Sequence, residues 1–123
     1  FFGDNQTIEK ETISDLDKGF VSRFKSLVEE RMKDAELNVE DLGRNMGMSR
    51  VQLYRKLKSL TNYSPNELLR QMRLKKAASL LASSDMTVAE IAYEVGFSSP
   101  SYFTKCYKEQ FGESPTEFLK RRG

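Results

Sequence analysis

The sequence predicts an all-α fold of about seven helices, in which two helix-turn-helix units are joined by a long linker helix. Three observations support this prediction. Apolar residues recur at helical spacing along most of the chain, a glycine turn twice separates two short helices, and capping residues precede nearly every apolar stretch. We expect residues 1–13 to be a linker or the remainder of an upstream domain, and residues 14–123 to form the domain itself.

The first helix-turn-helix unit is expected at residues 14–64. Ser14 is an N-cap candidate for a helix over residues 15–34, because the apolar residues that follow have a 3.6-residue period. Asn38 precedes a second, short helix in the same way. Gly47 ends that helix where the chain must turn, and glycine accepts the positive φ that such a turn requires.

A third helix is expected directly after this turn. Ser49 and Gln52 have the spacing of a capping box, in which each side chain hydrogen-bonds the backbone of the other residue. One side of the helix is apolar and is expected to be buried, at Leu53, Leu57 and Leu60. The helix therefore combines a buried stripe with a basic outer face.

The linker helix is expected at residues 65–82. It opens with Ser64 as the N-cap, Pro65 at the first helical position and Glu67 at the third. Most of its circumference is apolar, so other elements must cover it on more than one side. Its charged residues are expected to form one exposed stripe, which comprises Arg70, Arg73 and Lys76.

The second unit, at residues 83–123, repeats the plan of the first. Thr87 and Glu90 form another capping box, and Gly96 stands at the turn. Ser99 then caps a helix that begins with a proline. The buried stripe of this helix is expected to comprise Phe103, Tyr107 and Phe111.

The two units align along the sequence. An offset of 49 residues relates Gly47 to Gly96, and after a one-residue insertion an offset of 50 relates Leu53 to Phe103. The linker helix would be roughly 27 Å long at 1.5 Å per residue, and successive major grooves on one face of B-DNA are about 34 Å apart. A rigid helix of this length could hold two recognition helices in adjacent grooves.

Charge is unevenly distributed along the chain. The net charge is +2, yet residues 1–20 carry five acidic and two basic residues. Between Ser49 and Lys76 there are eight Lys or Arg residues and a single acid, Glu67. A local basic segment is typical of a surface that meets a polyanion, although a solvated helix face has the same composition.

The sequence offers little support for an enzyme. Histidine is absent, no glycine-rich phosphate loop precedes a helix, and the acidic residues fall on solvated faces and helix starts. The single cysteine, Cys106, excludes an internal disulfide and lacks any metal-ligand spacing around it, so we expect a packing or surface thiol. We predict no catalytic residue, no metal and no cofactor.

Three stretches of the chain resemble a known family. They are Asn38–Ser64 with Pro65, the linker from Asn66 to Ala82, and the run from Thr87 to Pro115, which contains Ile-Ala-Tyr-Glu-Val-Gly-Phe-Ser-Ser-Pro-Ser-Tyr-Phe. Together they resemble the AraC/XylS family of bacterial transcription regulators, over residues 15–122. The resemblance implies a double helix-turn-helix fold, binding to double-stranded promoter DNA, contact with RNA polymerase and activation of transcription.

The stretch Ser49–Arg70 is most similar to the output domains of two-component regulators, including hybrid sensor kinases. This similarity implies that an upstream receiver or sensor domain controls the module in the full-length protein. A small stand-alone member of the family is the alternative source.

The resemblance also implies which residues face DNA. In the first unit they are Arg50, Val51, Tyr54, Arg55 and Lys58, and in the second they are Ser99, Pro100, Ser101, Thr104 and Lys105. Tyr54 could equally pack against protein. In the second unit Pro100 cannot donate a hydrogen bond and Ser101 is short, so we expect phosphate contacts there. Arg55 is expected to be the main base reader, because arginine to guanine is the commonest specific contact.

A helical protein-interaction module that uses the fold without DNA is the main alternative function. Steep salt dependence would favour DNA, since binding through phosphates weakens linearly in log salt. No apolar run approaches 18 residues and no signal-peptide pattern is present. We therefore expect no membrane contact by this segment and a location in the bacterial cytoplasm.

Overall fold

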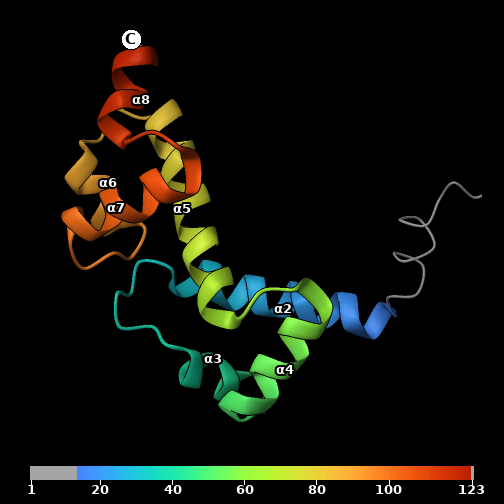
Figure 1. Ribbon diagram of the computed structural model, residues 1–123. Coiled ribbons are helices and arrows are strands. Elements are labelled where there is room, and N and C mark those ends of the chain that lie inside the picture. Colours follow the sequence, from blue (N-terminus) through green and yellow to red (C-terminus); the bar gives the residue numbers. More distant parts are fainter. Residues whose placement is uncertain (1–13, 123) are drawn as a thin grey trace, which may run out of the picture.

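The computed structural model describes residues 14–122, so the expected linker at residues 1–13 lies outside the described residues, as does Gly123. The described chain forms seven α-helices and no strand, which confirms the predicted all-α fold. The helices are α2 (Asp15–Arg31), α3 (Val39–Asn45), α4 (Arg50–Thr61), α5 (Pro65–Ser83), α6 (Val88–Glu94), α7 (Pro100–Phe111) and α8 (Pro115–Arg122). In Figure 1, α5 connects a lower unit, formed by α2–α4, with an upper unit, formed by α6–α8.

Side-chain caps fix the starts of these helices. At α5, the backbone N–H of Glu67 donates to the Ser64 hydroxyl at 3.2 Å, and the N–H of Ser64 donates to the Glu67 carboxylate at 2.8 Å. Pro65 occupies the first helical position, where no N–H is needed. The same reciprocal pairing is present at Ser49 with Gln52, at Thr87 with Glu90 and at Ser114 with Glu117. The predicted capping boxes are therefore confirmed.

Helix α2 ends at Arg31 rather than at the predicted residue 34. The Asp34 carboxylate explains the difference, because it accepts hydrogen bonds from the Glu36 backbone N–H at 2.9 Å and from Arg31 at 3.1 Å. An aspartate that bonds the backbone two residues further on stabilises a turn that competes with the helix. The chain therefore leaves α2 as a loop over residues 32–37, the 32–37 loop, which approaches the upper unit in Figure 1.

Two hydrophobic cores share helix α5. The first is formed by α2, α3, α4 and the first half of α5, and its completely buried residues are Phe24, Val28, Leu42, Leu53 and Leu57. The second is formed by the second half of α5 with α6 and α7, and its completely buried residues are Ala77, Leu81, Ile91, Ala92, Val95 and Phe103. Helix α5 is thus covered on more than one side, as its composition predicted.

The prediction that Phe111 belongs to the buried stripe of α7 is wrong. Phe111 is 40% exposed, whereas Phe103 and Tyr107 are almost completely buried. Residues four apart on an α-helix are rotated by about 40° relative to one another, so the third residue of such a series turns out of the core. Cys106 lies on the buried side instead, which makes it a packing thiol.

The capping boxes predict how the stability of the domain responds to acid. The backbone N–H of Ser64 lowers the pKa of Glu67 from its ordinary value of 4.5, and the N–H of Ser114 does the same for Glu117. A carboxylate with a depressed folded-state pKa stabilises the fold above its ordinary pKa, and this contribution is lost as the pH falls through the folded-state value. We therefore expect the midpoint of thermal unfolding, followed by circular dichroism, to fall as the pH drops below about 4.5.

A double variant, E67Q/E117Q, isolates the contribution of the caps. Glutamine keeps the capping geometry, as Gln52 does opposite Ser49, but it does not titrate. We expect this variant to lose less thermal stability than the parent chain between about pH 6 and about pH 3. Parallel pH profiles for the two proteins would show that the caps have no part in the acid response.

Candidate nucleic-acid interface

Helix α4 is oriented by its capping box and by two buried leucines. The backbone N–H of Gln52 donates to the Ser49 hydroxyl at 3.2 Å, and the Ser49 N–H donates to the Gln52 side chain at 2.9 Å. Leu53 and Leu57 are completely buried in the first core. Because these leucines fix the rotation of the helix about its axis, the opposite side of α4 must face solvent.

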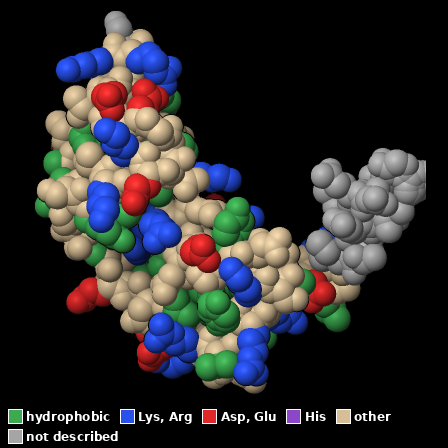
Figure 2. Space-filling model, in the orientation of Figure 1, with side chains coloured by type: hydrophobic (Ala, Val, Ile, Leu, Met, Phe, Trp, Pro, Cys, Tyr) green, Lys and Arg blue, Asp and Glu red, His purple; other side chains and the backbone are tan. Residues whose placement is uncertain are grey.

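All five first-unit residues that were predicted to face DNA are exposed: Val51, Tyr54, Arg55 and Lys58 lie on the outer side of α4, and Arg50 is its first residue. Val51 is 56% exposed and Tyr54 is 48% exposed, so neither belongs to the core. The three cations of this set are exposed as well. We call the whole set the α4 face: Arg50, Val51, Tyr54, Arg55 and Lys58. Figure 2 shows basic and apolar side chains together at the lower end of the molecule, where α3 and α4 lie in Figure 1.

The cations of the α4 face have only weak partners in the protein. Arg50 lies 4.0 Å from Glu40, and Lys58 lies 3.9 Å from Glu67, all at exposed positions. Arg55 forms no ion pair within the described part of the chain. Exposed ion pairs contribute about 0–1 kcal/mol, so a phosphate or a base edge can replace these partners at little cost.

Lys56 of the same helix is oriented differently. Its Nζ lies 3.6 Å from Asp17 and 5.0 Å from the centre of the Phe20 ring, both in α2. This lysine stabilises the packing of α4 on α2 and is not part of the α4 face. Counting basic residues along the sequence therefore overstates the charge that this face offers.

Helix α7 presents a smaller and less basic face. The Ser99 hydroxyl accepts a hydrogen bond from the Tyr102 N–H at 3.3 Å, and Pro100 occupies the first helical position. Two of the predicted residues, Ser101 and Lys105, are exposed, and the other three are partly buried. We call the whole set the α7 face: Ser99, Pro100, Ser101, Thr104 and Lys105. A single cation in this set means that its attraction for a polyanion is weaker than that of the α4 face.

The same turn precedes both faces. After α3 the Met48 N–H donates to the Gly43 carbonyl at 2.8 Å, and after α6 the Phe97 N–H donates to the Ala92 carbonyl at 2.9 Å. Both are the long hydrogen bond of a Schellman motif, which needs a left-handed residue after the helix. The left-handed residues are Gly47, with φ 70°, and Gly96, with φ 95°. The internal repeat of the sequence therefore corresponds to two copies of one turn geometry.

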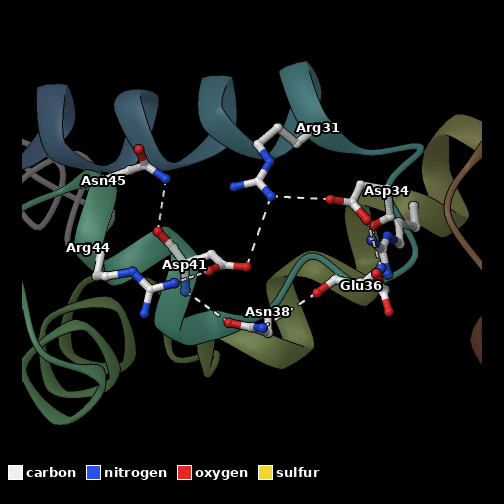
Figure 3. Close-up of polar contacts among 8 residues, drawn as sticks. Arg31, Asp34, Glu36, Asn38, Asp41, Arg44 and Asn45 are labelled. Atoms are coloured by element: carbon white, nitrogen blue, oxygen red, sulfur yellow. Dashed lines mark hydrogen bonds and ion pairs between the residues drawn. The ribbon is translucent and has the colours of Figure 1, made fainter.

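Asp41 anchors α3 beside α2, as Figure 3 shows. Its carboxylate pairs with Arg44 in the same helix and lies 4.0 Å from Arg31 of α2. Its backbone N–H donates to the Asn38 cap at 2.9 Å, and the Asn45 side chain donates to the Asp41 carbonyl at 2.9 Å. Helix α3, which leads into the turn before α4, is thereby held in a fixed position on α2.

The prediction of an exposed stripe on α5 is wrong for Arg73. Arg73 is only 9% exposed, and its Nη2 donates a hydrogen bond to the backbone carbonyl of Asp34 at 2.8 Å. Arg70 and Lys76 are exposed, as expected. The sequence did contain a signal, because Arg73 stands in a series of residues four apart whose other members are buried: Leu69, Ala77 and Leu81. An arginine within an apolar series is a candidate for a buried contact.

The chain has two equivalent turns, one before and one after the long helix α5 in the sequence. Each turn is followed by a helix with an exposed outer face, and this arrangement defines a double helix-turn-helix domain. This is a class of DNA-binding domain. Residues 42–121 match the model of a family described as a helix-turn-helix domain. The chain belongs to this family, and within it to the AraC type of transcriptional regulator.

Individual relatives agree with this assignment. The chain is 37% identical over 110 residues to histidine kinase P4 of Formosa agariphila, an alignment that covers 89% of this chain and 8% of that protein. It is 28% identical to the C-terminal domain of AraT, a response regulator from Geobacillus stearothermophilus, with a TM-score of 0.79 and coverage of 90% and 88%. It is 30% identical to the DNA-binding domain of AdpA, a global transcriptional factor solved in complex with a target DNA, with a TM-score of 0.76 and coverage of 81% and 89%. The chain thus spans a small part of the kinase and most of the two solved domains.

The described residues lack two other features. Across residues 14–122, no helix is both long and apolar enough to cross a membrane. The same residues contain no group of three or more His, Cys, Asp or Glu side chains that could hold a metal ion.

Proposed function

We propose that this chain is the DNA-reading output domain of a transcription regulator, and that the α4 face and the α7 face enter adjacent major grooves of one duplex. The observation that carries the proposal is the repeated turn, which presents two outer helix faces from a single chain. Helix α5 has 19 residues and so spans roughly 28 Å, which is comparable with the separation of successive major grooves, about 34 Å. One chain would then read two half-sites about 10 base pairs apart.

Within this proposal the two faces have different roles. The planar guanidinium of Arg55 can bind O6 and N7 of guanine together, and its exposure on α4 leaves it available for that contact. On α7, Pro100 lacks an N–H donor and Lys105 is an exposed point charge. The α4 face therefore supplies most of the base readout, and the α7 face mainly holds phosphates.

The same proposal extends to the full-length protein. Residues 14–64 and 83–123 act as the two reading units, joined by the linker helix at residues 65–82, and an upstream receiver or sensor domain controls them. The names of two relatives, a histidine kinase and a response regulator, support two-component control. The partners are promoter DNA and RNA polymerase. The regulator activates transcription in the bacterial cytoplasm. The chain itself catalyses no reaction and makes no membrane contact.

Selection of binding sites from a random duplex library tests the proposal with this chain alone. We expect enrichment of a two-part site whose halves lie about 10 base pairs apart. Enrichment of only a single short site would show that one unit reads DNA and the other does not. In that case one chain would not read two half-sites, and the α7 face would contribute phosphate contacts alone.

Salt dependence separates DNA binding from the alternative of a protein-interaction module. For the selected site we expect log Kd to rise linearly with log salt, with a slope of about 0.9 for each phosphate that the protein neutralises. The measurement is a fluorescence anisotropy titration at several salt concentrations. Absence of DNA binding at low salt would overturn the proposal in favour of a protein partner.

A further inference from the structure

Arg73 lies where α5 passes from one core to the other. Met72 packs against the first core, and Leu74 belongs to the second. From this position the Arg73 side chain reaches the 32–37 loop, where it donates to the Asp34 carbonyl at 2.8 Å. Its Nε is buried and has no hydrogen-bond partner in the described part of the chain. Burial of a guanidinium is costly, so its position here points to a specific role.

Gly96, in the turn of the second unit, completes the contact. A β-carbon built on Gly96 would lie 2.0 Å from the Met32 carbonyl oxygen and 2.8 Å from Arg73 Nε, both too close for real atoms. The backbone of this turn therefore lies directly against the first unit. At the equivalent Gly47, a β-carbon would meet nothing within 4 Å. The close approach is thus a property of the contact between the units and not of the turn itself.

The 32–37 loop is firmly attached to the first unit. Asp34 accepts a hydrogen bond from Arg31 at 3.1 Å, and Arg31 also reaches Asp41 of α3 (Figure 3). Leu37 is 4% exposed and belongs to the first core. A contact made to this loop is therefore a contact made to the whole first unit.

Beside this contact the two cores share one partly buried side chain among the described residues, that of Met32. A hollow of about 420 Å³ lies between the 32–37 loop, α5 and the start of α7, and its lining includes Leu37, Arg70 and Tyr102. Both units pack on α5, and beside this hollow few other contacts join them. These are made by Met32, Asp34, Arg73 and Gly96, which we call the junction.

We propose that the junction fixes the angle between the two reading units, and that Arg73 is a positioning residue for binding to two grooves at once. The inference rests on the proposed function, because it concerns how the α4 face and the α7 face are held at the spacing of DNA. Two linked sites strengthen binding only when their geometry allows simultaneous engagement. Without the junction the units can change their relative orientation, and this gain is reduced.

The relative orientation of the units can be measured without DNA. The distance between the units can be measured by pulsed electron paramagnetic resonance. One spin label is placed on S59C in α4 and the other on E109C in α7, in a C106A background. We expect one narrow distance distribution with Arg73 in place and a broader or shifted distribution for R73M, which keeps an apolar side chain but loses the bond to Asp34. R73K retains a donor and should remain closer to the parent. Unchanged distributions for R73M would overturn the proposal.

A pair of glycine variants controls for stability. G47A and G96A both place a side chain at a positive φ, but only G96A also forces the turn away from Met32 and Arg73. We expect the distance distribution to change for G96A and to remain narrow for G47A. Equal behaviour of the two variants would contradict a specific role of the junction, and it would do so even if R73M failed to fold.

DNA binding gives the second readout. R73M is expected to lose about tenfold in affinity for a two-part site, while its affinity for an isolated first half-site stays within about twofold of the parent. An equal loss for both DNAs would mean that Arg73 acts through general stability. If the parent chain binds no DNA, the proposed function fails, and the spin-label distances still decide whether the junction orients the units.

Discussion

Replacing Phe103 by alanine is expected to lower the free energy of unfolding by about 3–5 kcal/mol. The Phe103 side chain is completely buried, and its ring centre lies 5.2 Å from that of Phe97 and 5.8 Å from that of Tyr107. Its removal would leave a cavity between two aromatic rings that cannot collapse into the space. Urea denaturation followed by circular dichroism measures the loss, which is large for a domain of this size.

Phe111→Ala is the matched control in the same helix. Phe111 also contacts Tyr107, with ring centres 4.6 Å apart, but it is 40% exposed. Water already reaches this side chain, so we expect a loss below about 1.5 kcal/mol. Comparable losses for the two variants would mean that the second core extends to the end of α7, contrary to the burial described above.

Arg55→Ala is expected to cost about 1–3 kcal/mol of binding discrimination. The discrimination compared is that between the selected site and a site in which one guanine is replaced. Lys105→Ala should instead weaken binding to both sites alike and lower the salt slope by about one. The difference arises because a guanidinium can recognise a base edge through two hydrogen bonds, whereas an ammonium group neutralises a phosphate without reading sequence. Competition titrations with the two duplexes measure both quantities.

Lys56→Ala provides a control for the loss of positive charge on α4. Lys56 pairs with Asp17 and covers the Phe20 ring, so it points away from the α4 face. Its replacement should leave base discrimination unchanged. If Arg55→Ala and Lys105→Ala lost discrimination equally, the proposed division of roles between the two helices would be wrong.

The helices could be predicted from the sequence because their signals are local. A capping box such as that of Ser49 and Gln52 involves residues three apart, and a Schellman turn needs only one glycine at the right position. The described residues contain the glycine turn twice, at Gly47 and Gly96, and the reciprocal cap four times, at Ser49, Ser64, Thr87 and Ser114. The repeat therefore predicted the fold and the outer faces of α4 and α7 before any tertiary contact was considered.

The three errors have different physical causes. The burial of Arg73 results from its hydrogen bond to a loop 39 residues earlier in the sequence. The early end of α2 has a local cause, because the Asp34 carboxylate accepts the Glu36 N–H two residues further on and so closes a turn. For Phe111 the error was geometric, because a spacing of four drifts around a helix whose period is 3.6. The series of residues four apart marks Arg73 as a candidate for burial, but it cannot show that its partner is the Asp34 carbonyl.

The sharing of α5 between two cores has a consequence for folding. Each half of this helix forms a wall of a different core, with Leu68 and Leu69 in the first and Leu74 and Leu81 in the second. Unfolding of α5 as a whole would remove a wall from both cores, so we expect neither unit to unfold independently of the other. We therefore expect the two halves to unfold as a single cooperative unit, with the amides in the middle of α5 among the slowest to exchange with solvent.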